Sequence, residues 1–144
     1  MVIRELCEAD YPSVCSLINI ELGYSEITLG ELTARLELMS QDDDYRAFIA
    51  LADGKVVGFV GTFRGIAFEM KGFYLRVIAL AVSLDYRNIG IGRSLIKHVE
   101  DYAGTLGITA FAVNSGLKRQ NAHTFYEHCG FSKRTYGFGK DTSF

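Results

Sequence analysis

The segment from Tyr74 to Ser94, YLRVIALAVSLDYRNIGIGRS, constrains the fold of this chain more than any other segment. It opens with an apolar run, residues 77–82, whose length and composition are typical of a strand buried on both faces. A glycine-rich turn, residues 87–92, follows. From Ile91 onward the apolar side chains recur three or four positions apart, which predicts an amphipathic helix. The segment therefore predicts a strand, a turn and a helix in immediate succession.

A strand, glycine-rich turn and helix in this order are typical of a phosphate site, because the free N–H groups and the positive dipole end of the helix face the ligand. The dinucleotide-binding pattern G-x-G-x-x-G would need glycine where Leu95 stands. The P-loop would need lysine after the glycine, but the chain has Gly92-Arg93-Ser94. The turn instead has the pattern Arg-x-x-Gly-x-Gly. Its alternative interpretation is a tight turn that needs glycine for its backbone angles.

The other apolar patterns predict a mixed α/β sheet with helices on both faces. Asp53-Gly54 is a strong hairpin signal, Thr28 and Glu31 fit a capping box, and Asp10 is placed to cap an earlier helix. Residues 63–72 are expected to form a loop, either a wall of the substrate site or ordinary packing. The expected order is βααβββαβαβ, with strands at 2–6, 46–52, 55–62, 77–82, 108–114 and 131–138, and helices at 11–22, 28–39, 91–106 and 118–130.

Composition and charge exclude several classes of protein. A chain of 144 residues with 49% hydrophobic residues is expected to form one domain, residues 1–144, rather than a disordered chain. The net charge of -2 gives no general attraction to nucleic acid or to an anionic membrane. The charged N-terminus and the lack of a long apolar segment predict neither a secretion signal nor a membrane span. Three cysteines without C-x-x-C spacing suggest neither disulfides nor a metal site, so a cytoplasmic protein is expected.

A second motif lies near the end of the chain, on the helix predicted over 118–130. Its sequence is Asn121-Ala122-His123-x-Phe125-Tyr126-x-x-x-Gly130-Phe131. Together with the Arg-x-x-Gly-x-Gly turn, this motif resembles the signature of the GNAT superfamily of N-acetyltransferases, which bind acetyl-coenzyme A (acetyl-CoA). The two motifs stand in the expected order and at the expected distance. The earlier helices and the hairpin agree with the layout of the family, so the resemblance covers essentially the whole chain.

The resemblance implies a GNAT-like acyl-CoA N-acyltransferase fold, in which the central strand and the strand after it splay apart at their C-terminal ends. The pantetheine arm of acetyl-CoA would lie in this gap, and the glycine-rich turn would hold the pyrophosphate. Asn121 would hydrogen-bond the pantetheine, and Asn114 would help to hold the acetyl end. The residues expected to bind acetyl-CoA are Leu80, Ala81, Val82, Arg87, Asn88, Ile89, Gly90, Ile91, Gly92, Arg93, Ser94, Asn114, Asn121, Phe125 and Tyr126.

The implied chemistry is direct attack of an amine on the thioester, which requires a base, donors for the oxyanion and an acid for the departing sulfur. Tyr126 matches the tyrosine that relatives place beside the sulfur and is the expected acid; plain packing is its alternative role. Many relatives carry a glutamate on the central strand, but residues 76–82 contain no acid. Glu69, and secondly Glu26 or Glu21, are candidates for the base, with ordered water or a surface role as alternatives. His123 is expected to be a helix-surface or packing residue.

The sequence therefore predicts an acetyl-CoA-dependent N-acetyltransferase that acts on a primary amine. Residues 21–24 resemble a turn that borders the acceptor site in small-molecule and aminoglycoside-type relatives, which favours a small amine. The alternatives are a protein or peptide N-acetyltransferase and a non-catalytic acyl-CoA-binding module; the second motif disfavours an unrelated nucleotide-phosphate binder. Homodimerisation is common in relatives, and residues 133–139 are the expected contact.

Overall fold

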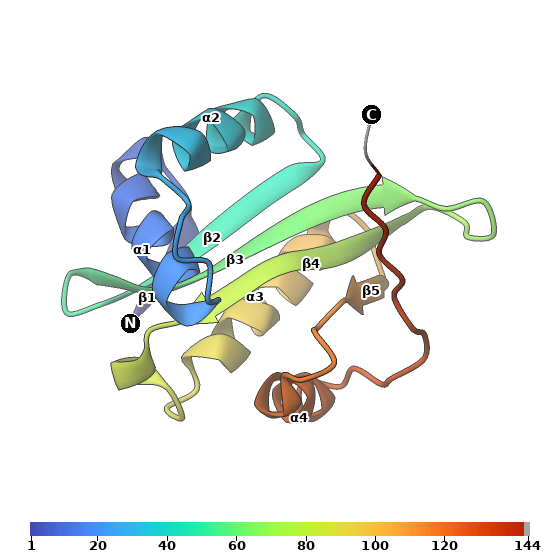
Figure 1. Ribbon diagram of the computed structural model, residues 1–144. Coiled ribbons are helices and arrows are strands. Elements are labelled where there is room, and N and C mark those ends of the chain that lie inside the picture. The colour runs from blue at the N-terminus through green and yellow to red at the C-terminus, as the bar shows by residue number, and fades with distance from the viewer. Residues whose placement is uncertain (143–144) are drawn as a thin grey trace.

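The computed structural model describes residues 1–142 and contains a five-stranded sheet in the order β1-β2-β3-β4-β5 (Figure 1). The first four strands pair antiparallel, and β5 runs parallel to β4. The mixed α/β sheet is therefore confirmed. The strands are β1 (Val2–Glu5), β2 (Tyr45–Ala52), β3 (Lys55–Ile66), β4 (Phe73–Val82) and β5 (Ala110–Val113), and the helices are α1 (Tyr11–Glu21), α2 (Leu29–Ser40), α3 (Ile91–Thr105) and α4 (Gln120–His128).

Helices cover both faces of the sheet, as the apolar patterns predict (Figure 1). On one face, α1 and α2 bury Val14 and Leu32 against Ile49 of β2. On the other face, α3 buries Leu95 and Val99 against the sheet. The sheet therefore lies between two apolar layers, and burial of these layers is the main favourable contribution to folding.

Two local signals predict structure correctly. In the β2–β3 turn, Asp53 and Gly54 have φ of 52° and 75°, the left-handed angles that a two-residue hairpin turn needs. At the start of α2, the Glu31 N–H donates to Thr28 Oγ1 at 3.1 Å, and the Thr28 N–H donates to Glu31 Oε2 at 3.3 Å. Both signals involve residues close in sequence, so the surrounding fold is not needed to satisfy them.

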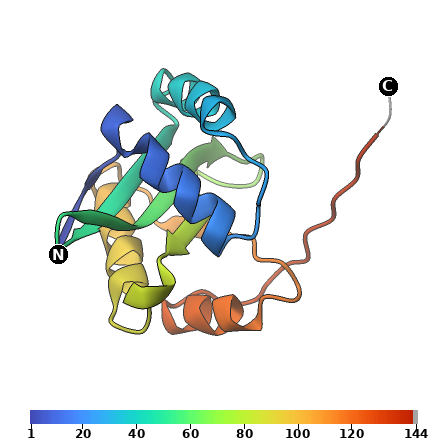
Figure 2. The same ribbon diagram turned by 60° about the vertical axis from the view of Figure 1, so that its left-hand side comes forward.

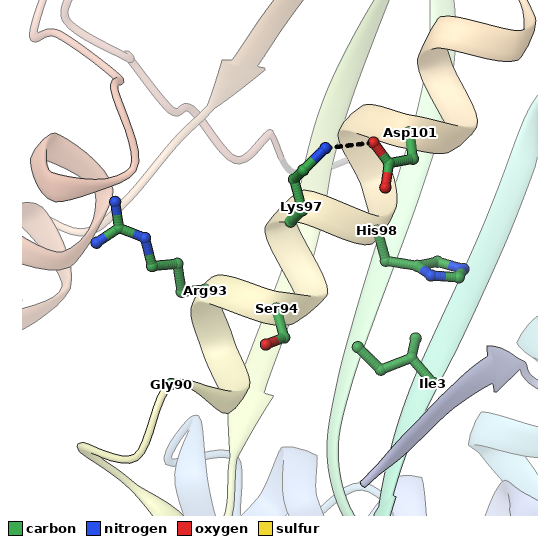
Figure 3. Close-up of a pocket in the computed structure, with 7 residues that line it drawn as sticks. All are labelled: Ile3, Gly90, Arg93, Ser94, Lys97, His98 and Asp101. Carbon is green, nitrogen blue, oxygen red and sulfur yellow. Dashed lines mark hydrogen bonds and ion pairs between the residues drawn. The ribbon is translucent and has the colours of Figure 1, made fainter.

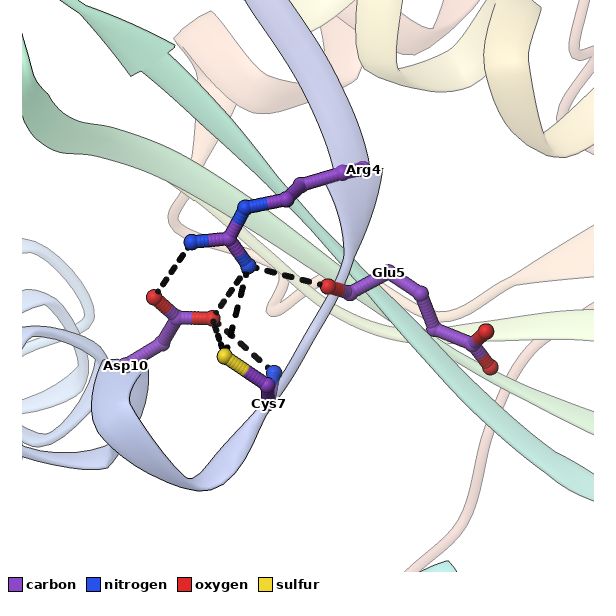
Figure 4. A network of polar contacts seen from close by, with 4 residues as sticks. All are labelled: Arg4, Glu5, Cys7 and Asp10. Atoms are coloured by element: carbon purple, nitrogen blue, oxygen red, sulfur yellow. Dashed lines mark hydrogen bonds and ion pairs between the residues drawn. The ribbon is translucent and has the colours of Figure 1, made fainter.

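Asp10 has a different role from the predicted helix cap. Its buried carboxylate accepts two hydrogen bonds from the Arg4 guanidinium, at 2.7 and 2.9 Å, and one from the Cys7 backbone N–H at 2.9 Å (Figure 4). No side-chain capping bond is made at the start of α1. The pKa of Asp10 is lowered, first by the hydrogen bonds from Arg4. Asp10 therefore fastens β1 to the segment that enters α1.

The pairing of β4 with β5 ends halfway along β4. Only Tyr74–Val77 pairs with β5, opposite Ala110–Val113. Residues 78–82 of β4 continue along β3, but in the described part of the chain they have no strand partner on their other edge. A bulge precedes this stretch, because Thr62 pairs with Val77 and Gly61 with Ala79, which leaves Ile78 as an extra residue. The splayed central strands are therefore confirmed.

The prediction of a final strand over 131–138 is wrong. Among residues 1–142, no strand follows α4, and residues 132–142 are exposed. Figure 2 shows this segment extending away from the sheet and helices. Gly137 and Gly139 weaken strand propensity, and no buried face forms to offset the ordering cost. A smaller correction concerns the predicted loop 63–72, because β3 continues to Ile66. The expected homodimer contact through 133–139 stays a prediction.

Two other features bear on the predicted class of protein. Within residues 1–142, none of the helices is both long enough and apolar enough to cross a lipid bilayer. The same part of the chain holds no group of three His, Cys, Asp or Glu side chains arranged to bind a metal ion.

Candidate active site

The glycine-rich turn forms the entrance to α3. After β4 ends at Val82, a short 3-10 turn (Leu84–Tyr86) leads to Gly90, which precedes α3 and has φ of 91°. This left-handed angle favours glycine. The Ser94 N–H donates to the Gly90 carbonyl at 2.9 Å and begins the helical pattern. The N–H groups of residues 91–93 precede this bond, so they have no intrahelical acceptor and can bind an anion.

The two sequence motifs meet at the start of α3. A Cβ atom added to Gly92 would lie 3.1 Å from two ring carbons of Phe125 on α4. This distance is tighter than ordinary van der Waals contact, so a side chain at this position would require the Phe125 ring to shift by a few tenths of an ångström. The second glycine of the turn therefore serves the contact between the two motifs.

Arg87 lies at the junction of α1 and the end of β4. Its guanidinium forms an ion pair with the Glu21 carboxylate, and its Nε donates to the Val82 carbonyl at 3.1 Å. Glu21 also accepts a hydrogen bond from the Leu84 N–H at 3.3 Å. The Glu21 side chain is only 10% exposed. The sequence predicts that Arg87 binds the pyrophosphate. It does not reveal the contact with Glu21, because Glu21 and Arg87 are far apart in the chain.

A groove of about 520 Å³ runs along the side of α3 that faces Ile3 of β1, next to the turn (Figure 3). Arg93 and Ser94 line it in the first turns of the helix, and the Lys97–Asp101 ion pair lines it further along. In Figure 3 the Arg93 side chain points toward α4 and away from Lys97. Arg93 and Ser94 follow the glycine-rich turn in the first turn of α3, and their contact with the pyrophosphate stays a prediction. Asn88 and Ile89 are exposed in the turn itself.

Tyr126 is the buried residue of α4. It is 9% exposed, and its ring meets those of Phe125 and Phe131 edge to face, with ring centroids 5.3 and 5.8 Å apart. Burial raises the pKa of the Tyr126 hydroxyl, and the charge of Arg119 opposes this shift. The hydroxyl is therefore protonated at neutral pH, as a general acid must be. Asn121 is exposed in the first turn of the same helix.

The gap between β4 and β5 closes where the two strands still pair, at Val77 and Val113, and this closed end is polar. Asn114, which follows the last residue of β5, accepts a hydrogen bond from Arg76 of β4 at 2.9 Å. His123 closes the loop between β5 and α4, because its Nε2 donates to the Gly116 carbonyl at 2.7 Å. This contact agrees with the packing role expected of His123. Arg76 was not among the predicted site residues. It immediately precedes the predicted central strand, 77–82, and the structure includes it in β4.

The structure does not bring the candidate base Glu69 to the unpaired part of β4. Glu69 is exposed in the turn between β3 and β4, whereas the unpaired residues 78–82 end the strand at its other end. Six residues of extended chain separate Phe73 from Ala79, or about 20 Å. Figure 1 shows this turn at the far end of the sheet from the start of α3. Glu26 is exposed between α1 and α2, and Glu21 is engaged by Arg87.

Comparison with known proteins identifies the class of protein to which the chain belongs. The sequence model described as "Acetyltransferase (GNAT) family" matches residues 11–131. The chain is 27% identical over 117 residues to an uncharacterized N-acetyltransferase of Bacillus subtilis, covering 81% of this chain and 82% of that protein. It is 26% identical over 130 residues to the aminoalkylphosphonate N-acetyltransferase of Salmonella typhimurium, covering 90% and 81%.

Solved structures agree in fold. The fold matches that of an aminoglycoside N-acetyltransferase in complex with CoA, with a TM-score of 0.85, 17% identity, and coverage of 98% of this chain and 93% of the other. The chain therefore belongs to the acetyltransferase (GNAT) family. It is an acetyltransferase, and acetyl-CoA is the acyl donor that enzymes of this family use.

Proposed function

We propose that the chain transfers the acetyl group of acetyl-CoA to the primary amine of a small molecule, with Tyr126 as general acid. The observation that carries this proposal is the loss of β5 from the edge of β4 after the Val77–Val113 pair. Backbone N–H and C=O groups along residues 78–82 are left without a strand partner there, and exposed main-chain groups of this kind suit a ligand that pairs with them.

The residues around the gap fit an acyl-CoA thioester. The free N–H groups at the start of α3 would hold the pyrophosphate, with Arg93 and Ser94 beside them. The backbone of Leu80 to Val82 would pair with the pantetheine arm and supply donors to the thioester oxygen. Phe125 packs against the turn, and Asn121 and Asn114 lie on the segments that flank the gap. Bound acetyl-CoA supplies an activated acetyl group.

The protons can be followed through the reaction. The amine nitrogen forms a bond to the acetyl carbon while the carbon–sulfur bond breaks. Tyr126 would give its proton to the departing sulfur, and the burial of its side chain and the raised pKa of its hydroxyl support this role. The attacking ammonium would lose its proton to ordered water, since Glu69 lies at the other end of β4 and Glu21 is paired with Arg87.

The small-molecule acceptor is supported by the relatives. One curated relative is named for aminoalkylphosphonates, and one structural neighbour is named for aminoglycosides. Both names describe small amines, and the match to the first relative spans 90% of this chain. A protein or peptide acceptor and a non-catalytic acyl-CoA-binding module are the alternatives that the experiment must separate.

The test is release of free thiol from acetyl-CoA with a panel of amines that includes polyamines, aminoglycosides, amino acids and short peptides. Wild type is compared with Tyr126→Phe. The matched control is Tyr102→Phe, because Tyr102 lies on α3 and packs against Phe48 of β2, not against the residues of α4. Release with a small amine that falls in Tyr126→Phe alone supports the proposal. Turnover with peptides alone would indicate the protein acceptor. Binding of acetyl-CoA without any release would indicate the binding module.

A further inference from the structure

Arg76 lies on the face of β4 that is opposite to α3. Its neighbours Leu75 and Val77 are 0% and 3% exposed in the apolar cluster that contains Leu95 and Val99 of α3. Successive side chains of a strand point to opposite faces of the sheet. The Arg76 side chain is therefore directed to the face that α1 and α2 cover further along β4, and it is half-buried there.

Arg76 also lies at the closed end of the gap between β4 and β5. It pairs with Ala112, and the next pair, Val77 with Val113, is the last before the strands separate. The first unpaired residues of β4 are thus two or three positions away, about 7–10 Å along the strand. The Arg76 side chain therefore lies on this face beside the last paired residues of β4.

Within residues 1–142, no carboxylate neutralises the charge of Arg76. The other arginines of the sheet, Arg4 on β1, Arg46 on β2 and Arg64 on β3, each form an ion pair with a carboxylate. Within residues 1–142, Arg76 has no carboxylate at ion-pair distance. Its Nη1 instead donates to Asn114 Oδ1 at 2.9 Å, and its guanidinium carbon lies 5.8 Å from the centroid of the Tyr74 ring. These neutral contacts orient the guanidinium and leave its charge available.

We propose that Arg76 binds an anionic group of the acceptor, so that the amine acetylated by this chain carries a carboxylate or a phosphorus oxyanion. The guanidinium presents donors in a planar fork that matches such groups. Asn114 is the positioning residue, because its Oδ1 holds the fork at the closed end of the gap. The same positive charge disfavours a polycationic acceptor. This inference rests on the proposed function and names the substrate class of the same site.

The experiment compares amines that differ in the anionic group. β-Alanine is matched with propylamine, and phosphoethanolamine with ethanolamine. The variants are Arg76→Gln, Arg76→Lys and the control Arg64→Gln, because Arg64 is a sheet arginine that pairs with Asp44. Wild type is expected to favour the anionic member in kcat/KM by roughly tenfold or more, which is the size of one charged hydrogen-bonded contact.

The variants separate a binding role from a structural one. In Arg76→Gln the ratio of kcat/KM between matched amines is expected to fall by roughly tenfold, through the KM of the anionic member. Arg76→Lys keeps the charge but loses the fork, so it should retain part of the ratio. Arg76→Glu should reverse the preference and favour diamines such as putrescine. The control Arg64→Gln should keep the wild-type ratio.

Two results would overturn the inference: equal kcat/KM for matched amines in wild type, or an unchanged ratio in Arg76→Gln. Failure of the proposed function has a different signature, because no amine would release thiol. In that case the thermal stability of the CoA-saturated protein is measured with and without phosphoethanolamine. Stabilisation in wild type that is lost in Arg76→Gln would still support the inference, and its absence in wild type would refute it.

Discussion

Arg87, in the loop after β4, forms an ion pair with Glu21, the last residue of α1. The contact joins the end of α1 to the first residue of the glycine-rich turn. Glu21 also accepts the Leu84 N–H, and Arg87 donates to the Val82 carbonyl. Two backbone groups at the end of β4 are thereby satisfied by side chains, which holds this end of the strand in place.

We expect Glu21→Ala to lower the free energy of unfolding by about 1–2 kcal/mol. The nearly buried Glu21 carboxylate accepts one hydrogen bond from the partly exposed Arg87 and one from the Leu84 N–H, and the variant loses both. Urea unfolding followed by circular dichroism measures the change. Glu26→Ala, in the exposed segment after α1, is the matched control and should change stability by less than about 0.5 kcal/mol. Equal stability of the two variants would show that the ion pair does not hold the loop.

Tyr126→Phe is expected to lower kcat by about 10²-fold or more, since general acid catalysis contributes on this scale. Affinity for acetyl-CoA should change little, because the ring and its aromatic contacts remain. Steady-state kinetics and equilibrium binding measure the two effects separately. A variant with wild-type kcat would exclude Tyr126 as the acid.

The pH dependence of turnover offers a second view of Tyr126. Burial raises its pKa, so the acid stays protonated throughout the neutral range. Loss of activity caused by its ionisation should therefore begin only above the ordinary tyrosine pKa of about 10. The pH profile of kcat, recorded with Tyr126→Phe alongside, checks this. A wild-type decline below this pH that is missing in the variant would contradict the raised pKa.

Gly92→Ala should weaken acetyl-CoA binding, and Gly92→Val should weaken it further, because the new Cβ lies 3.1 Å from the Phe125 ring and forces the two motifs apart. Gly104→Ala is the matched control on the same helix, where a Cβ has no atom within 4 Å. That control should bind normally and gain up to about 1 kcal/mol of stability from its better helix propensity. Titration calorimetry and urea unfolding distinguish the two sites, and normal acetyl-CoA binding by Gly92→Val would refute the placement of the pyrophosphate.

Asp10→Asn should cost about 1–3 kcal/mol at neutral pH, because Asp10 is a buried carboxylate that accepts from both Arg4 and Cys7. The pKa of Asp10 is lowered in the folded protein, so its stabilisation is complete above the unfolded pKa of about 3.9 and is lost as pH falls through the folded pKa. The difference between wild type and variant in urea unfolding should therefore shrink in acid. The exposed Asp43→Asn should show no comparable change.

Much of the fold was predictable from the sequence because its signals are local. The Thr28–Glu31 capping box and the Asp53-Gly54 turn join residues a few positions apart, and the apolar period of α3 depends on one helix alone. Asp10 shows the limit of such signals. Its position before a helix predicted a cap, but Arg4 on β1 offers two charge-assisted hydrogen bonds, which outweigh one capping bond.

The sequence by itself determined the order of strands and helices up to α4, the glycine-rich turn and the family to which the chain belongs. Only the tertiary structure decided that β4 loses its partner after Val77, that Glu21 holds Arg87, and that Arg76 finds no carboxylate partner among residues 1–142. It also decided that residues 131–138 form no strand. The physical reason is that strand pairing and ion pairing join residues distant in the chain, and their energies depend on which groups the whole fold brings together.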